Sequence, residues 1–189
     1  MPISRLSRVA LLCAAALALT PAAASAATGA GCDPSQPVEQ VFARWSDDNW
    51  YRLAPGGDFE PGSTAWTLTG GAKVVLGNAY QKVGGSSDAY SLLLPPGATA
   101  TSPTTCVSID EPTFRLFTSG GMGSAAMAQA VYASMTVPAG FAYGGPWMPT
   151  MPMLTGSGKH GSQFSIRLTN NSRASIRIDD VYIDPYKRS

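Results

Sequence analysis

The sequence predicts an all-β sandwich of about eight antiparallel strands. Short β-prone runs recur along the chain, and turns rich in glycine and proline, such as Gly70-Gly71 and Pro95-Pro96-Gly97, separate them. This even spacing of short runs and turns is typical of sandwiches, and it places the domain at residues 57–189. The predicted strands are Ala65 to Thr69, Ala72 to Leu76, Tyr90 to Leu94, Thr101 to Ile109, Thr113 to Thr118, Gln129 to Val137, Gln163 to Thr169 and Ser175 to Ile183.

An N-terminal arm, residues 27–56, precedes these strands. Pro34 and Pro37 favour an extended chain over a helix at its start. Between Val38 and Leu53, three aromatic residues are interleaved with aspartates. This pattern predicts an edge strand followed by a turn at Ser46-Asp47-Asp48-Asn49.

Two segments in the second half of the chain are ambiguous. The alanines between Met122 and Met135 favour a helix, whereas Val131, Tyr132 and the preceding glycines favour a loop that enters a strand. We expect the strand. The segment from Pro146 to Pro152 is predicted to be a connection broken by prolines.

The last two predicted strands differ in pattern. Phe164, Ile166 and Leu168 alternate with polar residues, which predicts a strand with one face on the core. In the final strand the apolar positions change parity at Asp179-Asp180, which a β-bulge would explain. An edge position or burial of both faces would explain it equally well. A carboxylate that a bulge turned inward would need a partner, because an unpaired buried charge is costly.

Residues 1–26 have the features of a secretory signal peptide. Arg5 and Arg8 precede an apolar run from Val9 to Leu19, and Ala24-Ser25-Ala26 supplies small residues for cleavage. The apolar run is roughly half the ~20 residues that a membrane-spanning helix needs. We therefore expect a secreted, extracellular protein with no integral membrane segment after signal removal.

Removal of the two arginines would change the formal net charge from +1 to −1. A nearly neutral protein offers no basic surface for nucleic acid and no polybasic patch for anionic membranes. Neither partner is expected.

Two cysteines, Cys32 and Cys106, remain after removal of the signal. In an oxidising compartment they predict one disulfide, which would close a loop of about 75 residues and stabilise the fold by about 4 kcal/mol. Two free thiols or a metal pair are the alternatives. The metal pair is a poor one, because His160 is the only histidine.

Two short motifs lie at opposite ends of the predicted sandwich. Gly57-Asp58-Phe59-Glu60 is followed by Trp66, and the final strand contains Ile178-Asp179-Asp180-Val181. Both resemble motifs of the galactose-binding-like jelly-roll superfamily, the fold of many carbohydrate-binding modules. The resemblance implies that the sandwich is a jelly roll. The whole chain also resembles small secreted actinobacterial proteins, which implies no activity.

The same resemblance implies a structural calcium ion that joins the first and last strands. Its ligands would be Glu60 and either Asp179 or Asp180, with backbone carbonyls completing the shell. Calcium takes six to eight hard oxygen donors, and carboxylates suit it. Alternatively, these acidic side chains accept hydrogen bonds from backbone N–H groups in turns.

Exposed aromatic rings are the usual sugar-binding groups, because they pack against the apolar face of a pyranose. Phe59 and Trp66 are expected in the core. Packing is the alternative for every other aromatic residue as well, and Trp147 is the strongest candidate because its loop is rich in proline and methionine. The candidates are Trp147, Tyr143, Tyr80 and Tyr132.

Catalysis has little support in the sequence. His160 lies in a glycine-rich turn, and no Gly-x-Ser-x-Gly motif occurs. A pair of carboxylates for glycoside hydrolysis would have to come from residues that also suit turns. These residues are Asp58, Glu60, Asp110 and Glu111.

We therefore expect a secreted, non-catalytic module that binds glycan or a cell-envelope surface. The alternative is a structural or protein-interaction component of the cell surface without a glycan ligand. That alternative would use an adaptable apolar patch of methionines. The patch would consist of Met122, Met127, Met148, Met151 and Met153.

Overall fold

The computed structural model describes residues 36–63, 65–107, 111–156 and 162–184. Within these ranges the chain forms thirteen strands and one short 3-10 helix, Ala43–Trp45. The predicted signal peptide and Cys32 lie outside the described residues, so secretion and the disulfide stay predictions. No helix in the described ranges is both long and apolar enough to cross a membrane.

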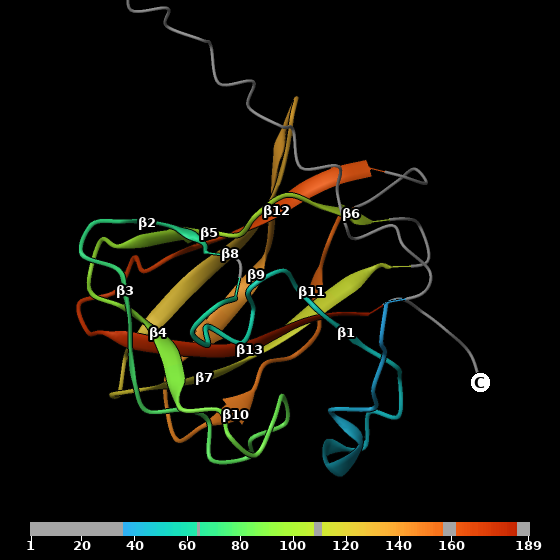
Figure 1. Cartoon of the computed structure of the whole chain (residues 1–189). Helices are drawn as coiled ribbons and strands as arrows, with labels where there is room; N and C mark the ends of the chain where they lie inside the picture. The colour runs from blue at the N-terminus through green and yellow to red at the C-terminus, as the bar shows by residue number, and fades with distance from the viewer. Residues whose placement is uncertain (1–35, 64, 108–110, 157–161, 185–189) are drawn as a thin grey trace, which may run out of the picture.

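The strands form two sheets, in which every pair of neighbours is antiparallel (Figure 1). Sheet I contains β1 (Arg52–Leu53), β3 (Lys73–Leu76), β4 (Tyr90–Leu94), β7 (Thr113–Gly120), β10 (Met148–Pro149), β11 (Met153–Leu154) and β13 (Ile176–Asp184). Sheet II contains β2 (Thr67–Thr69), β5 (Thr99–Thr101), β6 (Thr105–Val107), β8 (Ala125–Tyr132), β9 (Thr136–Tyr143) and β12 (Ser162–Thr169).

The strand order places residues that are far apart in sequence side by side. Sheet I runs β10-β7-β13-β4-β3, with β1 pairing β13 and β11 pairing β7. Sheet II runs β2-β5-β12-β8-β9, with β6 pairing β12. The chain crosses repeatedly between the sheets, as it does in jelly rolls. The all-β sandwich that the sequence predicts is therefore confirmed.

The main core lies between the two sheets. Side chains of alternate residues enter it, as in β12, where Phe164, Ile166 and Leu168 are buried and their neighbours are not. Phe59 and Trp66 also belong to this core, at 5% and 7% exposure, as predicted. Their rings lie 5.2 Å apart between centroids.

The segment from Met122 to Met135 contains a strand, as predicted, but the strand has different limits. The expected run from Gln129 to Val137 contains the end of β8, a hairpin turn and the start of β9. The turn, residues 133–135, contains Ser134 but no glycine, proline, asparagine or aspartate, so the sequence gives only a weak turn signal there. Similarly, the expected run from Thr101 to Ile109 divides into the end of β5 and β6.

The N-terminal arm differs most from the prediction. Instead of an edge strand, it contains the 3-10 helix, a single bridge between Glu39 and Tyr51, and the short β1. The proline-broken connection after Pro146 contains β10. In both segments the chain follows the outer edge of sheet I, where tertiary contacts override local preference.

The β-bulge that the sequence offers as one explanation for the final strand is present, and the strand is also buried on both faces. The pairing of β13 with β7 shifts register between Asp179 and Tyr182, and Asp180 adopts a positive φ of 47°. The shift lets Ile178 and Val181 both enter the core. Asp179 and Asp180 are both buried, at 1% exposure each.

Candidate functional site

The outer face of sheet I is covered over β7 and β13. The arm places Phe42 against Phe117 of β7 and Tyr182 of β13, with ring centroids 5.5 Å and 6.0 Å away. Tyr51 closes the cluster 4.7 Å from Phe42. Arg115 of β7 lies 4.3 Å from the Phe42 ring centroid. This second core follows from outward-facing aromatics on β7 and β13, which a solvent-exposed sheet face would not carry.

The outer face of sheet II carries no such cover in the described structure. Along β8 from Ala125 to Val131 and along β12 from Phe164 to Thr169, residues alternate between buried and half-exposed. We call the outward side chains of β2, β5, β8, β9 and β12 the open face. The strand register aligns them in rows across the sheet, and these rows consist of side chains that are distant in sequence.

One row of the open face begins with Phe141, which stacks on Tyr143 of the neighbouring row. Phe141 of β9 is 54% exposed and Tyr143 is 67% exposed, and their rings stack with centroids 6.2 Å apart. The strand register continues this row across the sheet. It reads Phe141, Met127, Thr169, Thr99 and Thr69.

The adjacent row is more polar. It reads Pro138, Gln129, Arg167, Thr101 and Thr67. Among the described residues, neither Gln129 nor Arg167 has a side-chain hydrogen bond or ion pair. Both side chains therefore offer free donors at the centre of the face.

β9 contains a proline, Pro138, next to a register shift in its pairing with β8. β9 is the last strand of its sheet, and a proline is tolerated at a sheet edge because one side makes no ladder hydrogen bonds. The pairing with β8 shifts register between Ala128 and Gln129. This irregularity returns Phe141 and Tyr143 to the outward side.

The predicted sugar-binding aromatics lie in four different settings. Tyr143 belongs to the open face, and Tyr80 is equally exposed, at 67%, in the β3–β4 loop of the other sheet. Trp147 is half-buried against the second core. Tyr132 stacks on Phe164 and donates a hydrogen bond to the Thr155 carbonyl at 2.6 Å. The loop of Tyr80 contacts the Trp147 segment, because Gln81 Nε2 donates a hydrogen bond to the Trp147 carbonyl at 2.8 Å, but of the four only Tyr143 belongs to the aromatic pair of the open face.

Phe141 was not among the sequence candidates. Its run, Thr136 to Tyr143, contains a proline and a glycine and does not alternate regularly, so its outward direction was not readable. The predicted methionine patch is dispersed as well. Met153 is buried, Met127 is on the open face, and Met122 and Met151 are exposed elsewhere.

A second candidate site is a group of acidic residues around Gly84, which we call the acidic site. Both carboxylate oxygens of Asp180 and Oδ2 of Asp88 are buried without a hydrogen-bond partner. A Cβ placed on Gly84 would lie 2.8 Å from Asp180 Oδ1 and 2.8 Å from Asp88 Oδ2. The two oxygens therefore face a common position. Asp58 and Glu60 complete the acidic site through their electrostatic effect on Asp180.

The two other predicted metal ligands are already hydrogen-bonded. Asp179 Oδ2 accepts from the Ala79 N–H at 2.7 Å, and its Oδ1 accepts from the Asp180 N–H at 3.0 Å. Glu60 Oε1 accepts the N–H groups of Ala89 and Tyr90 at 2.7 and 2.8 Å. In the described ranges no three His, Cys, Asp or Glu side chains form a metal-binding group.

Burial and like charge act together on the acidic site. Burial raises the pKa of Asp180 above the usual carboxyl range, and Asp88, Asp58 and Glu60 raise it further. Burial likewise raises the pKa of Asp88, with Glu60 and Asp58 adding to the effect and Lys82 opposing it. A cation between Asp180 and Asp88 would relieve this repulsion.

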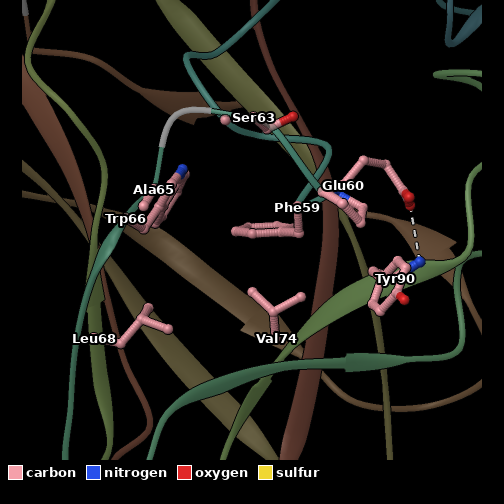
Figure 2. Close-up of a pocket in the computed structure, with 10 residues that line it drawn as sticks. Phe59, Glu60, Ser63, Ala65, Trp66, Leu68, Val74 and Tyr90 are labelled. Atoms are coloured by element: carbon pink, nitrogen blue, oxygen red, sulfur yellow. Dashed lines mark hydrogen bonds between the residues drawn. The ribbon is translucent and has the colours of Figure 1, made fainter.

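A pocket of about 290 Å³ opens between the edge strands β2 and β3 (Figure 2). Phe59, Trp66, Leu68 and Val74 supply apolar walls. The Glu60 side chain extends toward the Tyr90 N–H, away from the pocket. The pocket therefore offers few groups to bond a sugar hydroxyl.

The carboxylates considered for hydrolysis have different surroundings in the described structure. Glu111 is buried in an ion pair with Arg52, 2.7 Å from Glu111 Oε1 to Arg52 Nε. Asp58 and Glu60 belong to the acidic site. Asp110 and His160 lie outside the described residues.

No family model matches the sequence, and no curated protein matches it. Solved structures with a similar chain path include carbohydrate-binding modules. The CBM22-1 xylan-binding domain from Paenibacillus barcinonensis aligns with a TM-score of 0.47 at 15% identity, over 70% of this chain and 94% of that one.

Two further structures give similar values. The CBM22-1-containing part of Clostridium thermocellum xylanase 10B has a TM-score of 0.48 at 12% identity, over 72% of this chain and 27% of that one. A family 6 carbohydrate-binding module has a TM-score of 0.45 at 10% identity, over 62% of this chain and 86% of that one. The chain is similar to these modules in fold.

Proposed function

We propose that this protein is an exported, non-catalytic glycan-binding module whose binding surface is the open face of sheet II. The observation that carries the proposal is the pairing of two exposed, stacked aromatic rings with a row of polar side chains on the one sheet face that the described chain leaves bare. The features of a signal peptide in residues 1–26 support export.

The chemistry of the open face suits a sugar. The C–H groups of a pyranose pack on aromatic rings, and Phe141 and Tyr143 present such rings to solvent. The amide of Gln129 and the threonine hydroxyls can donate to and accept from sugar hydroxyls. A surface that combines an apolar platform with a few polar groups is the usual composition of a small-molecule site.

Strand geometry also favours binding. The open face is built from paired strands, so its side chains are held in rows before any ligand arrives. Preorganised groups lose less conformational entropy on binding than groups on mobile loops. A row that crosses five strands spans roughly 19 Å at a strand spacing of about 4.8 Å. This length suits an extended oligosaccharide better than a single sugar.

The test compares exposed aromatic residues on the two sheets. Tyr143→Ala and Phe141→Ala are each expected to weaken glycan binding by about tenfold or more, because each removes a platform for a sugar ring. Tyr80→Ala is the matched control, since Tyr80 is as exposed as Tyr143 but lies in the β3–β4 loop. Binding is measured by calorimetric titration with polysaccharides that the wild-type protein retains. Equal binding by wild type and both open-face variants would contradict the proposal.

We also propose that the acidic site holds a structural calcium ion. Asp180 and Asp88 would supply carboxylate oxygens, and backbone carbonyls and water the remainder. The supporting observation is the buried, unpartnered carboxylate of Asp180, which faces Asp88 across Gly84. The ion would join β13 to the loop before β4. Asp179 is left out of this ligand set, because backbone N–H groups already occupy both of its oxygens.

A further inference from the structure

We infer that the glycan bound on the open face is anionic and that Arg167 recognises its carboxylate or sulfate group. This inference rests on the proposed function and names the class of its ligand. It would make the protein selective for charged oligosaccharides and polysaccharides over neutral ones.

Charge on sheet II is confined to one side chain. Arg167 is the only Asp, Glu, Lys, Arg or His residue in β2, β5, β6, β8, β9 and β12. It occupies the central strand of its sheet, and its register neighbours are Thr101 and Gln129. The open face therefore has one positive centre and no carboxylate to neutralise it.

Arg167 is also unpaired within the described residues. The two ion pairs found there join Arg52 to Glu111 and Arg115 to Asp47, and neither involves sheet II. The side chain of Arg167 is half-buried and outward-facing at mid-strand. A guanidinium stays charged at every relevant pH, so the face carries this charge permanently.

The geometry of a guanidinium favours an oxyanion as its partner. Its planar array of N–H donors matches the two oxygens of a carboxylate or sulfate, and such charge-assisted pairs are about twice as strong as neutral hydrogen bonds. Partial burial of Arg167 between neighbouring strands reduces screening by salt. A neutral glycan would leave this charge without a counterpart.

The position of Arg167 relative to the aromatic pair implies more than one sugar unit. Phe141 lies on β9 and Arg167 on β12, with β8 between them. Two strand spacings, about 10 Å, separate their strands, and the two residues also lie in adjacent rows. A ring stacked on Phe141 and an anion held by Arg167 would therefore belong to different units of one chain.

The experiment uses two pairs of polymers, each with one backbone that carries anionic groups in one member and none in the other. Polygalacturonate is compared with its fully methyl-esterified form, and dextran sulfate is compared with dextran. The wild-type protein is expected to bind the charged member of a pair about tenfold more tightly. A preference within the first pair assigns the anion as a carboxylate, and a preference within the second assigns it as a sulfate.

Arg167→Gln is expected to abolish this preference, so that the variant binds the charged and the neutral member of a pair with equal affinity. Arg177→Gln is the matched control, because Arg177 is also a half-buried strand residue but lies near the start of β13 in sheet I. It should keep the full preference. Unchanged thermal unfolding midpoints establish that both variants are folded.

Three results would overturn the inference. If wild type binds the charged and neutral members equally, the inference of an anionic ligand is wrong, and the proposal of a glycan ligand still stands. A preference that survives in Arg167→Gln, or that Arg177→Gln loses equally, would mean that Arg167 does not recognise the anion. If no polymer of either kind is bound, the proposed function falls together with the inference.

Discussion

The ionised side chain of Asp180 is expected to destabilise the folded protein. Its carboxylate is buried at 1% exposure, has no hydrogen-bond partner, and lies near three other acids. The proposed calcium ion would turn this cost into a stabilising contact. Without the ion, the site should weaken the fold.

Asp180→Asn is therefore expected to have opposite effects in the two conditions. Asparagine is tolerated at positive φ, so the backbone at 47° is retained. In chelator the variant should be more stable than wild type at pH 8, by about 1 kcal/mol or about 2–4 °C in unfolding midpoint. Added calcium should raise the midpoint of wild type and not that of the variant. Scanning calorimetry measures both.

The pH dependence in chelator has a definite sign. Because the pKa of Asp180 is raised in the folded protein, the folded state binds more protons than the unfolded state above the ordinary carboxyl pKa of about 4. The folded wild-type protein therefore loses stability as pH rises and Asp180 ionises. The difference in stability between Asp180→Asn and wild type should grow between about pH 4 and pH 8. Asp48→Asn, at an exposed position, should show no such trend. If wild type and Asp180→Asn are equally stable in every condition, the acidic site does not bind a cation.

At the scale of elements, the N-terminal arm stabilises one sheet and leaves the other free. Its 3-10 helix follows Phe42, which is fully buried among four other aromatic rings. Those contacts cover β7 and β13. The arm is thus the element that makes the two outer faces of the sandwich different.

Phe42→Ala is expected to destabilise the protein by about 3–5 kcal/mol, the usual range for emptying a buried phenylalanine site. Urea unfolding of the mature chain measures the loss. Phe141→Ala is the same substitution at a 54% exposed position and should change stability by less than about 0.5 kcal/mol. Equal losses in the two variants would mean that the arm does not hold a second core.

The elements show which features were predictable from sequence. The alternation in β12 and the change of parity at Asp179-Asp180 are local patterns, and both led to the observed structure. The prediction for the arm was wrong because the arm's aromatic residues also suit an edge strand. Only the outward-facing Phe117 and Tyr182 indicate which surface the arm covers. The hairpin turn after Tyr132 contains no glycine, proline, asparagine or aspartate, so the side on which the Phe141 side chain lies was not predictable.

At the scale of the whole molecule, the two candidate sites differ in how they arise. The acidic site was partly predictable, because Glu60 and Asp180 belong to the two motifs at the ends of the domain, whereas Asp88 lies in an unremarkable loop. The open face was not predictable. Its rows join Phe141, Gln129 and Arg167 through strand register, a long-range property that a single sequence does not contain.

The central claim is that sheet II binds glycan through its open face. NMR spectra of the ¹⁵N-labelled protein, recorded during titration with oligosaccharides of the best-retained polymer, test it most directly. The proposed function predicts that amide shifts concentrate in β8, β9 and β12 and leave β4, β7 and β13 unchanged. Shifts concentrated on sheet I, or at the pocket between β2 and β3, would contradict it.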